Sequence, residues 1–447
     1  MSRTHAITAW EPEDATFWEA NGRRTARRNL WTSVFAEHIG FSVWSLWSVL
    51  VLFMTKNSGF HISPGDKFLL VSVVTLVGSA VRPGYGLAVT RLGGRTWTTL
   101  STLLLLVPVM LATLLMGEPR APLWAFLLCA AVSGLGGGCF AASTTNINFF
   151  FPEREKGRAL GINAGGGNLG VASVQLLGLL VIATAGAGHP RVLTEAFIPL
   201  LLVSAGLAYG LMDNLPGMRT DAGTYRNVLK DPHCWTVSLL YIGTFGSFIG
   251  YSFAFGLVLQ NDFGRSPLQA AALTFTGPLL GSLARPAGGW LADRFGPARI
   301  TLIVFAGLAA GTLLAIDASM AHSLPLFSVA FTVLFVLSGV GNGSTYAMIP
   351  APYAAAAAAA IATGTDPART RLDARRRTGA VIAFAGTAGG LGGAGINLAL
   401  RQSYLQAHNA RPALAGFLVF YAVCVAVTAL ARRRETAPAP VPVQAAA

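Results

Sequence analysis

Charge is scarce in this chain. Asp, Glu, Lys and Arg make up 11% of its 447 residues, whereas an ordinary soluble domain carries about 25%. This deficit argues against the two or more soluble domains that a chain of this length would otherwise contain. Acidic residues are scarcer than basic ones, 19 against 32, which leaves a formal net charge of +13. In a soluble protein that balance would indicate nucleic acid. Here the basic residues gather in the loops between apolar runs, so we expect no nucleic-acid partner.

Cysteines and catalytic motifs are also scarce. The four cysteines (Cys129, Cys139, Cys234 and Cys424) all fall in apolar runs, which argues against a disulfide framework and a Cys-x-x-Cys metal site. The glycine-rich runs lack the Gly-Lys-Ser/Thr ending of a phosphate-binding loop, and no His/Cys/Asp cluster has metal-ligand spacing. We therefore expect no enzyme, no cofactor and no use of ATP. We also expect no cleavable signal peptide, because the first apolar run begins near Leu30 after an Arg-rich start.

Long apolar runs dominate what is present. Hydrophobic residues make up 53% of the chain and the mean hydropathy is +0.56. Runs of about 20 apolar residues are long enough to cross a bilayer as helices. They predict an all-α membrane protein with twelve transmembrane helices, near residues 30–54, 67–90, 96–116, 123–146, 159–184, 196–213, 234–259, 268–291, 299–318, 325–349, 378–400 and 412–431.

The distribution of basic residues predicts an orientation. Loops that follow odd-numbered spans are poor in Lys and Arg, and loops that follow even-numbered spans are rich in them. The positive-inside rule then places both termini in the cytoplasm and the protein in the cytoplasmic membrane. A polyalanine run, Ala354–Ala360, leads into a basic stretch and is either a helix that extends span 10 or a surface linker.

The chain repeats itself around two arginines. Gly78-Ser79-x-x-Arg82-Pro83 recurs as Gly281-Ser282-x-x-Arg285-Pro286, at an offset of 203 residues. Gly134-x-Gly136-x-Gly138 in span 4 likewise returns as Gly339-x-Gly341-x-Gly343 in span 10, at an offset of 205. Two such six-span halves indicate a major facilitator fold with two pseudo-symmetric bundles. The expected division is an N-terminal cytoplasmic segment 1–29, a bundle 30–213, a linker 214–233, a bundle 234–431 and a tail 432–447.

A loop motif supports this fold. Gly289-Trp290-Leu291-Ala292-Asp293-Arg294-Phe295-Gly296 resembles the loop motif that follows span 2 or span 8 in the major facilitator superfamily. The first-half copy has Thr90 where the second has Asp293, so it keeps the pattern only in part.

The two arginines predict a central anion site. A charged residue inside a membrane helix costs roughly 2.5–3.5 kcal/mol on insertion scales. Arg82 and Arg285 occupy equivalent positions, and no acidic residue lies near either one in sequence. We therefore expect both charges to serve one anion between the halves. The alternative for each is a side chain that reaches the membrane surface, or an ion pair between the halves.

Glu37 is the one carboxylate well inside a predicted span. Burial favours the protonated form of such a group, so it can exchange a proton near neutral pH. We expect Glu37 to couple transport to protons. The alternative is a charge at the cytoplasmic end of the helix, or a partner for a loop arginine.

Spans 5 and 11 are rich in glycine, over Gly161–Gly170 and Gly386–Gly395. Small residues let membrane helices approach closely, so packing alone would explain most of these glycines. Asn168 is harder to explain by packing, because its amide can donate to an oxygen of a small anion.

Together with the segment from Phe140 to Pro152, these glycine runs resemble the nitrate/nitrite porter family of the major facilitator superfamily. The resemblance covers nearly all twelve spans. It implies that Arg82 and Arg285 hold a planar anion, with Asn168 and Tyr241 as donors and Phe140 and Phe245 as packing walls.

The resemblance also implies a function. We expect nitrate, and also nitrite, to cross by alternating access, with proton symport as the drive and a monomer in the lipid bilayer. Nitrate/nitrite exchange is the close alternative. A porter for another small anion and a membrane sensor that does not transport remain open.

Overall fold

The computed structural model describes residue 7, residues 9–215 and residues 222–436. The described chain is helical apart from short connections. Its first half contains these elements: α1 (Ala15–Phe17), η1 (Trp18–Gly22), α2 (Arg23–Ser45), α3 (Trp47–Phe53), η2 (Lys56–Ser58), α4 (Pro64–Ala80), α5 (Arg82–Leu92), α6 (Gly94–Leu104), α7 (Leu106–Leu115), α8 (Leu123–Ser133), η3 (Gly134–Gly138), α9 (Cys139–Phe150), α10 (Glu153–Thr184) and α11 (Pro190–Leu211).

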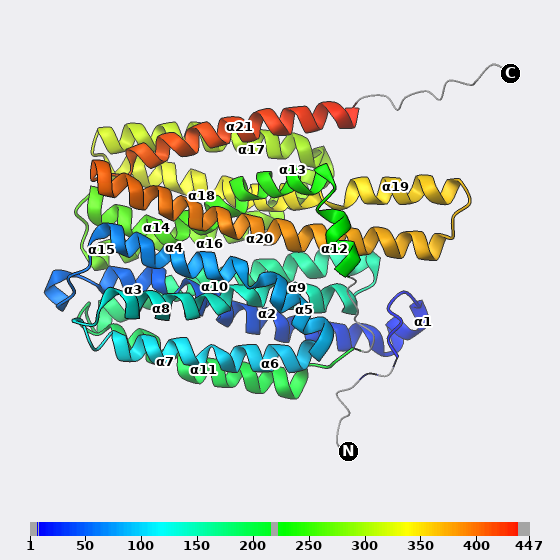
Figure 1. The fold of residues 1–447 in the computed structure, drawn as a ribbon, viewed down its shortest axis with the longest axis horizontal. Helices are drawn as coiled ribbons and strands as arrows, with labels where there is room; N and C mark the ends of the chain where they lie inside the picture. The colour runs from blue at the N-terminus through cyan, green and yellow to red at the C-terminus, as the bar shows by residue number, and fades with distance from the viewer. Residues whose placement is uncertain (1–6, 8, 216–221, 437–447) are drawn as a thin grey trace.

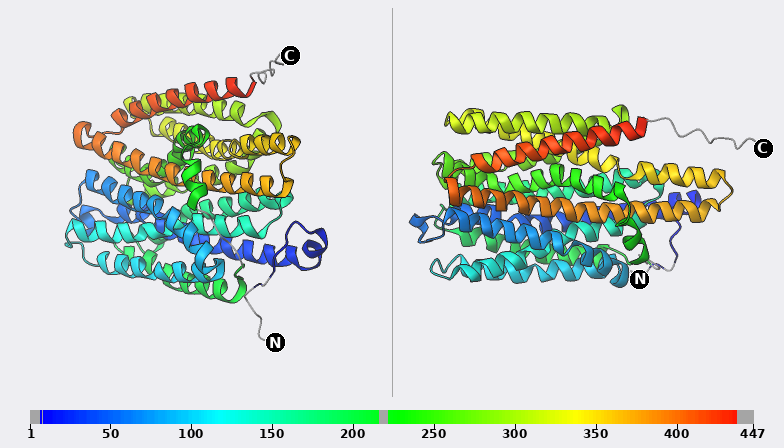
Figure 2. Two further views of the ribbon diagram at one scale, coloured as in Figure 1. Left: turned by 45° about the vertical axis from the view of Figure 1, so that its right-hand side comes forward. Right: turned by 45° about the horizontal axis from the view of Figure 1, so that its top comes forward.

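The second half follows a short helix, α12 (Ala222–Val228). It contains α13 (Pro232–Tyr241), η4 (Ile242–Gly246), α14 (Ser247–Asp262), α15 (Pro267–Thr274), α16 (Thr276–Phe295), α17 (Pro297–Met320), α18 (Leu324–Ala347), α19 (Pro350–Ala362), α20 (Pro367–Ala407) and α21 (Arg411–Thr436). Figure 1 shows the two halves side by side with their helices nearly parallel, and Figure 2 shows the same layering from two other directions.

The expected all-helical membrane fold is confirmed. Within the described residues, eleven helical segments are long and apolar enough to cross a membrane. The remaining expected span, 268–291, corresponds to α15 and α16, which run alongside the others in Figure 1. This segment is less apolar because it carries Arg285 with several prolines, glycines and hydroxyl residues.

Proline starts many of these helices. A helix leaves its first N–H groups without partners, so a residue that lacks an N–H costs nothing there. At α4, the Ser63 hydroxyl adds a cap by accepting a hydrogen bond from the Asp66 N–H at 3.1 Å. The helices whose first residue is proline are α4, α11, α13, α15, α17, α19 and α20.

Some boundaries differ from the expected ones. The polyalanine run is helical: α19 and the first turns of α20 form a hairpin that extends beyond the neighbouring helices (Figure 1). Residues 15–29, expected as an N-terminal segment, already form α1, η1 and the start of α2. The expected linker 214–233 contains α12 and the start of α13, and its residues 216–221 lie outside the described part. Hydropathy misses such helical extensions because polar helices can continue into water beyond the bilayer.

Both described ends of the chain lie at one end of the bundle, called here the terminal end; the opposite end is the far end. At the far end the halves meet through the stacked rings of Phe68 and Tyr404, whose centroids are 5.0 Å apart. The Gln175 side chain also donates to the Ser252 carbonyl at 2.8 Å. At the terminal end, Arg375 on α20 forms an ion pair with Glu153 on α10 at 2.9 Å. Contacts at both ends enclose the centre of the bundle.

Each half contains a glycine crossing, next to its arginine repeat, that brings two helices into backbone contact. A Cβ on Gly137 would lie 2.8 Å from the Gly78 Cα, and a Cβ on Gly339 would lie 2.8 Å from the Gly281 Cα. Side chains do not fit at such distances, so glycine is required at both crossings. The glycine before each arginine, Gly78 or Gly281, therefore has the same structural purpose in both halves.

This crossing predicts a stability difference. Gly339→Ala should lower the thermal unfolding temperature in detergent, because overpacking a tight contact costs about 1–3 kcal/mol. Gly206→Ala on α11 is the matched control, since an added Cβ there has nothing within 4 Å. Equal unfolding temperatures for the two variants would contradict the crossing.

Candidate functional site

The two repeated arginines lie buried at the centre of the bundle. Arg82 is 1% exposed and Arg285 is 6% exposed. Arg82 begins α5, directly after the single residue that separates α4 from α5. Pro83 follows it and has no N–H to continue the helical hydrogen bonds. Arg285 is the equivalent residue by the repeat and is also followed by a proline, Pro286, but it lies inside α16, which continues through this proline.

Hydrogen bonds and aromatic rings hold most of the Arg82 guanidinium in place. Its Nε donates to the Gly137 carbonyl at 3.2 Å, and its Nη1 donates to the Gly386 carbonyl of the second half. Three aromatic rings lie within cation–π range, with centroids 5.2–5.5 Å from Cζ: Trp44, Phe140 and Phe245. The remaining nitrogen, Nη2, is buried and has no hydrogen-bond partner. Arg82 is therefore rigidly oriented and has one donor nitrogen left to use.

The Arg285 guanidinium is held more loosely. Its Nη2 donates to the Tyr241 hydroxyl at 3.3 Å, and the Tyr346 ring lies 5.2 Å from its Cζ. Its Nη1 and the Tyr346 hydroxyl are both buried without a partner. A buried donor without a partner costs about 1–3 kcal/mol, more when it is charged. Such groups on both arginines indicate a ligand.

Aromatic side chains connect the two guanidinium groups. Phe245 lies against Arg82 and stacks on Tyr241 with ring centroids 5.1 Å apart and planes 4° apart. Tyr241 in turn accepts the hydrogen bond from Arg285. Phe140 stacks on Phe245 at 6.4 Å. The expected residues Arg82, Arg285, Tyr241, Phe140 and Phe245 therefore form one connected cluster with flat apolar walls.

Asn168 is fully buried on α10, and both of its amide atoms lack a partner. No recorded hydrogen bond joins it to the arginine cluster, so its place there is argued from the internal repeat. The added Cβ of Gly167 would meet Glu37, and that of Gly170 would meet the His38 carbonyl. In the second half, an added Cβ on Gly389 would meet Tyr241, and one on Gly392 would meet Ile242. Tyr241 and Ile242 lie 204 residues after Glu37 and His38.

This correspondence pairs Asn168 with Gly390. A Cβ on Gly390 would meet Ser79 and would lie 3.6 Å from the Arg82 Cζ. The equivalents of Ser79 and Arg82 are Ser282 and Arg285. The repeat therefore predicts that Asn168 lies beside Ser282, whose buried hydroxyl also lacks a partner, and beside Arg285.

Glu37 lies inside the first half with 1% exposure. Its Oε2 accepts from Asn163 Nδ2 at 2.7 Å and from the Ser143 hydroxyl, while its Oε1 has no partner. Both arginines are close enough to interact electrostatically with the carboxylate. Glu37 is therefore held by donors from α9 and α10 and lies near the arginine cluster rather than at a helix end.

Four contributing residues were missed from the sequence: Trp44 and Tyr346 against the arginines, and Ser143 and Asn163 against Glu37. The repeat offers a signal for Tyr346, because it follows the second glycine triplet almost as Phe140 follows the first. Glu37 and Ser143 are 106 residues apart, and no local pattern signals that contact.

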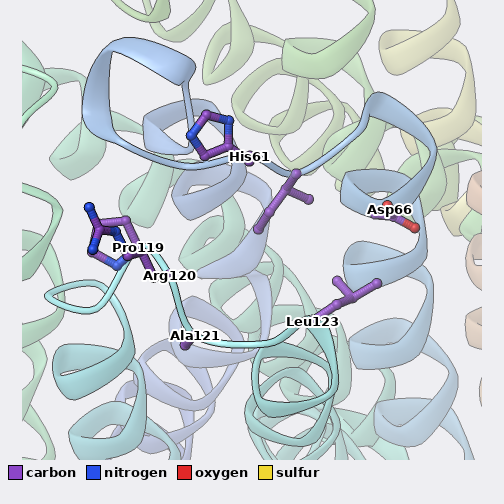
Figure 3. A pocket seen from close by; sticks show the side chains of 7 residues that line it. His61, Asp66, Pro119, Arg120, Ala121 and Leu123 are labelled. Atoms are coloured by element: carbon purple, nitrogen blue, oxygen red, sulfur yellow. The ribbon is translucent and has the colours of Figure 1, made fainter.

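A separate cavity of about 360 Å³ lies at the far end (Figure 3). Its labelled side chains, among them His61, Asp66 and Arg120, come from the α3–α4 and α7–α8 connections and from the first turns of α4 and α8, all in the first half. Neither arginine nor Glu37 lines it. The buried cluster is the stronger candidate because both repeats contribute to it.

Comparison with known proteins places these features in a family. The family model of the Major Facilitator Superfamily matches residues 30–396. The chain is 36% identical over 450 residues to the nitrate/nitrite transporter NarU of Salmonella typhimurium, covering 96% of this chain and 97% of that one. It is 35% identical over 371 residues to the probable nitrate/nitrite antiporter NarK2 of Thermus thermophilus, covering 77% of this chain and 82% of that one.

A solved structure agrees in fold. A bacterial homolog to the human lysosomal transporter Spinster, in an inward-facing and unoccupied conformation, has a TM-score of 0.64. The alignment covers 93% of this chain and 99% of that one at 15% sequence identity, so the likeness concerns the fold alone.

The placement of Asn168 predicts a cross-link. In a chain whose four native cysteines are replaced, Asn168→Cys with Ser282→Cys should form a disulfide on mild oxidation, as should Gly390→Cys with Ser79→Cys. The added Gly390 Cβ lies 3.0 Å from the Ser79 Cβ, so a small backbone adjustment brings the pair into disulfide range. Asn163→Cys with Ser282→Cys is the control, because Asn163 faces Glu37. A cross-link in the control pair alone, read by mass spectrometry, would contradict the placement.

Proposed function

The chain belongs to the Major Facilitator Superfamily, and we propose that it carries nitrate, together with nitrite, across the cytoplasmic membrane by alternating access. The observation that supports this most is the pair of unpartnered guanidinium nitrogens, Nη2 of Arg82 and Nη1 of Arg285, in one aromatic-walled cluster. The names of the relatives NarU and NarK2 support the same substrates.

The chemistry of the cluster suits a small planar anion. Guanidinium is planar, always charged and weakly hydrated, and it donates in a fixed fork that matches paired oxygens. Phe140 and Phe245 provide flat walls that would disfavour bulky or strongly hydrated anions. We propose that Asn168 and Tyr241 complete the site as donors to the remaining oxygens. The Tyr241 hydroxyl can do so because it accepts from Arg285 and keeps its own proton to donate.

The proposed orientation places both termini in the cytoplasm. The basic loops of the sequence support it, since positive residues favour the cytoplasmic side. In the structure the terminal end also carries the basic hairpin of α19 and α20, including Arg369, Arg371 and Arg376. Transport then consists of one half rocking against the other about the arginine cluster.

We propose proton symport as the driving force, with Glu37 as the proton-carrying group. Its burial and its two hydrogen-bond donors support this role. Moving one negative charge against the membrane potential costs roughly 2.3 kcal/mol per 100 mV. One proton per nitrate removes this cost, and a second proton would make uptake concentrative against the potential.

Nitrate/nitrite exchange is the second candidate. One observation favours it: the Thermus relative is named a probable antiporter. Exchange needs only the anion site and swaps equal charges, so it would not require Glu37. Flux of labelled nitrate in proteoliposomes, with and without a pH gradient and with and without internal nitrite, separates the two. Competition by formate and oxalate tests for another small anion, and binding without flux would indicate a sensor.

The proposed role of the arginine pair predicts that nitrate binding and uptake require a guanidinium group at both positions. Arg82→Lys and Arg285→Lys should each abolish most nitrate binding and uptake, because lysine keeps the charge but loses the planar fork. Arg95→Lys is the matched control, since Arg95 is half-buried and donates to the Tyr209 carbonyl away from the site. Size-exclusion profiles would confirm folding. Near-normal uptake in both site variants would refute the proposed site.

The proposed role of Glu37 predicts that pH-driven accumulation can be lost while anion exchange is kept. Glu37→Gln should lose nitrate accumulation driven by a pH gradient but keep nitrate counterflow, because the arginine pair is unchanged. Glutamine keeps a carbonyl oxygen to accept from Ser143 and Asn163, so the local packing should survive. Full pH-driven accumulation by Glu37→Gln would assign Glu37 a structural role and favour exchange.

A further inference from the structure

A small cavity lies inside the first half, beside Glu37. It lies between α2, α6 and α9, and the side chains that line it include Ser33, Glu37, Thr98, Ser101, Thr102 and Ser143. All six residues are buried, with at most 8% exposure. None of the anion-site residues lines it. The cavity is therefore a separate polar space within a membrane-spanning bundle.

The size and lining of the cavity suit water. Its volume open to a water molecule is about 10 Å³, which is close to the minimum for one molecule. A buried water needs two to four polar partners. The Ser33 hydroxyl is buried without a partner and can be one of them. Hydroxyls from α2, α6 and α9 supply the others.

A polar stripe on α2 connects the cavity to the terminal end. Asn29, Ser33 and Glu37 follow at intervals of four residues, so they lie on one face of the helix over about 12 Å. Asn29 is buried and donates to the Asp213 carboxylate at 2.8 Å. Asp213 also forms an ion pair with Arg28, whose side chain is 24% exposed and lies near solvent.

We propose that this stripe and its cavity are a water-filled proton route from the terminal-end surface to Glu37, separate from the path of the anion. The inference rests on the proposed role of Glu37 in proton coupling. The ligand is water, and the transferred species is a proton.

Ser143 supplies the last step of the route. Its Oγ donates to Glu37 Oε2, accepts from Asn163 Nδ2 at 2.8 Å, and retains one lone pair for a water in the cavity. A protonated water can give its proton to Ser143 Oγ as the original hydroxyl proton passes to Glu37 Oε2. The water loses one O–H bond, Ser143 Oγ gains one and loses one, and Glu37 Oε2 gains one, so the serine hydroxyl ends turned toward the cavity. The charge of one proton moves and no other reactant is needed.

The groups around Glu37 allow this assignment. The lining side chains of α6 are uncharged, and those that α10 presents to Glu37 are Asn163 and Gly167. On α9 the Cys139 thiol also lines the cavity. His38, on the same helix as Glu37, is paired with the Gly166 carbonyl at 3.0 Å.

The nearby charges belong to the anion site. Arg82 and Arg285 act on Glu37 electrostatically, and the Tyr346 hydroxyl is near enough to do so. Through these charges, proton binding at Glu37 depends on whether an anion lies between the arginines. A separate proton route then lets both ligands bind without competing for one entrance.

The route is tested by removing its hydroxyls. The double variant Ser33→Ala/Thr98→Val should lose most pH-driven nitrate accumulation in proteoliposomes, while nitrate counterflow stays close to that of the parent. Ser33→Thr with Thr98 kept should retain both activities, because the hydroxyl remains. Thr99→Val is the matched control: Thr99 is on the same helix, and its hydroxyl donates to the Arg95 carbonyl outside the cavity.

Glu37→Gln, measured beside these variants, separates the two ideas. If Glu37→Gln keeps pH-driven accumulation, proton coupling through Glu37 fails. If Glu37→Gln loses it and the double variant keeps it, the route alone is refuted. If the double variant also loses counterflow, the single variant Ser33→Ala is measured instead. pH-driven accumulation at the parent's rate would then overturn the route. Loss of pH-driven accumulation with counterflow kept would support it.

Discussion

The cost of keeping two guanidinium charges inside a membrane-spanning bundle shapes the centre of this protein. Arg82 is tolerated because two carbonyls and three aromatic rings surround it. Gly386 and Gly390 on α20 make that environment possible. The first offers its carbonyl, and the second leaves room where a side chain would meet Ser79 and press on Arg82. Arg285 has fewer partners, so an anion would complete its coordination more than that of Arg82. In our proposal, this asymmetry gives Arg82 the role of orienting the anion and Arg285 the response to its binding.

The two halves share one scaffold and carry different chemistry at equivalent positions. Tyr241 follows Glu37 by 204 residues, and Phe245 follows Phe41 by the same offset. The glycines that pack on Glu37 in the first half match those that pack on Tyr241 in the second. The position that serves as a proton carrier in our proposal is therefore an anion donor in the other half. In our proposal, divergence at this duplicated position lets one site respond to both a proton and an anion.

Much of this organisation could be predicted from the sequence because its signals are local. Apolar runs predicted the membrane spans, and the repeat around Arg82 and Arg285 predicted the halves. The family resemblance supplied Tyr241, Phe140 and Phe245, which the structure places beside the arginines.

The partners of Glu37 could not be predicted in this way. Ser143 and Asn163 lie 106 and 126 residues from Glu37, and nothing in their neighbourhoods signals the contact. The α19–α20 extension was also left open, because hydropathy does not distinguish a helix in water from a linker. Asn168 is intermediate: the sequence singled it out, and the internal repeat predicts that it lies beside Arg285.

The most direct test of the central claim is a structure of the protein determined with nitrate bound. The account predicts one planar density between the arginines, about 3 Å from both Arg82 Nη2 and Arg285 Nη1, the distance of a charge-assisted hydrogen bond. Density that contacts one arginine only, or that lies in the far-end cavity beside His61 and Arg120 with the central cluster unchanged, would contradict it.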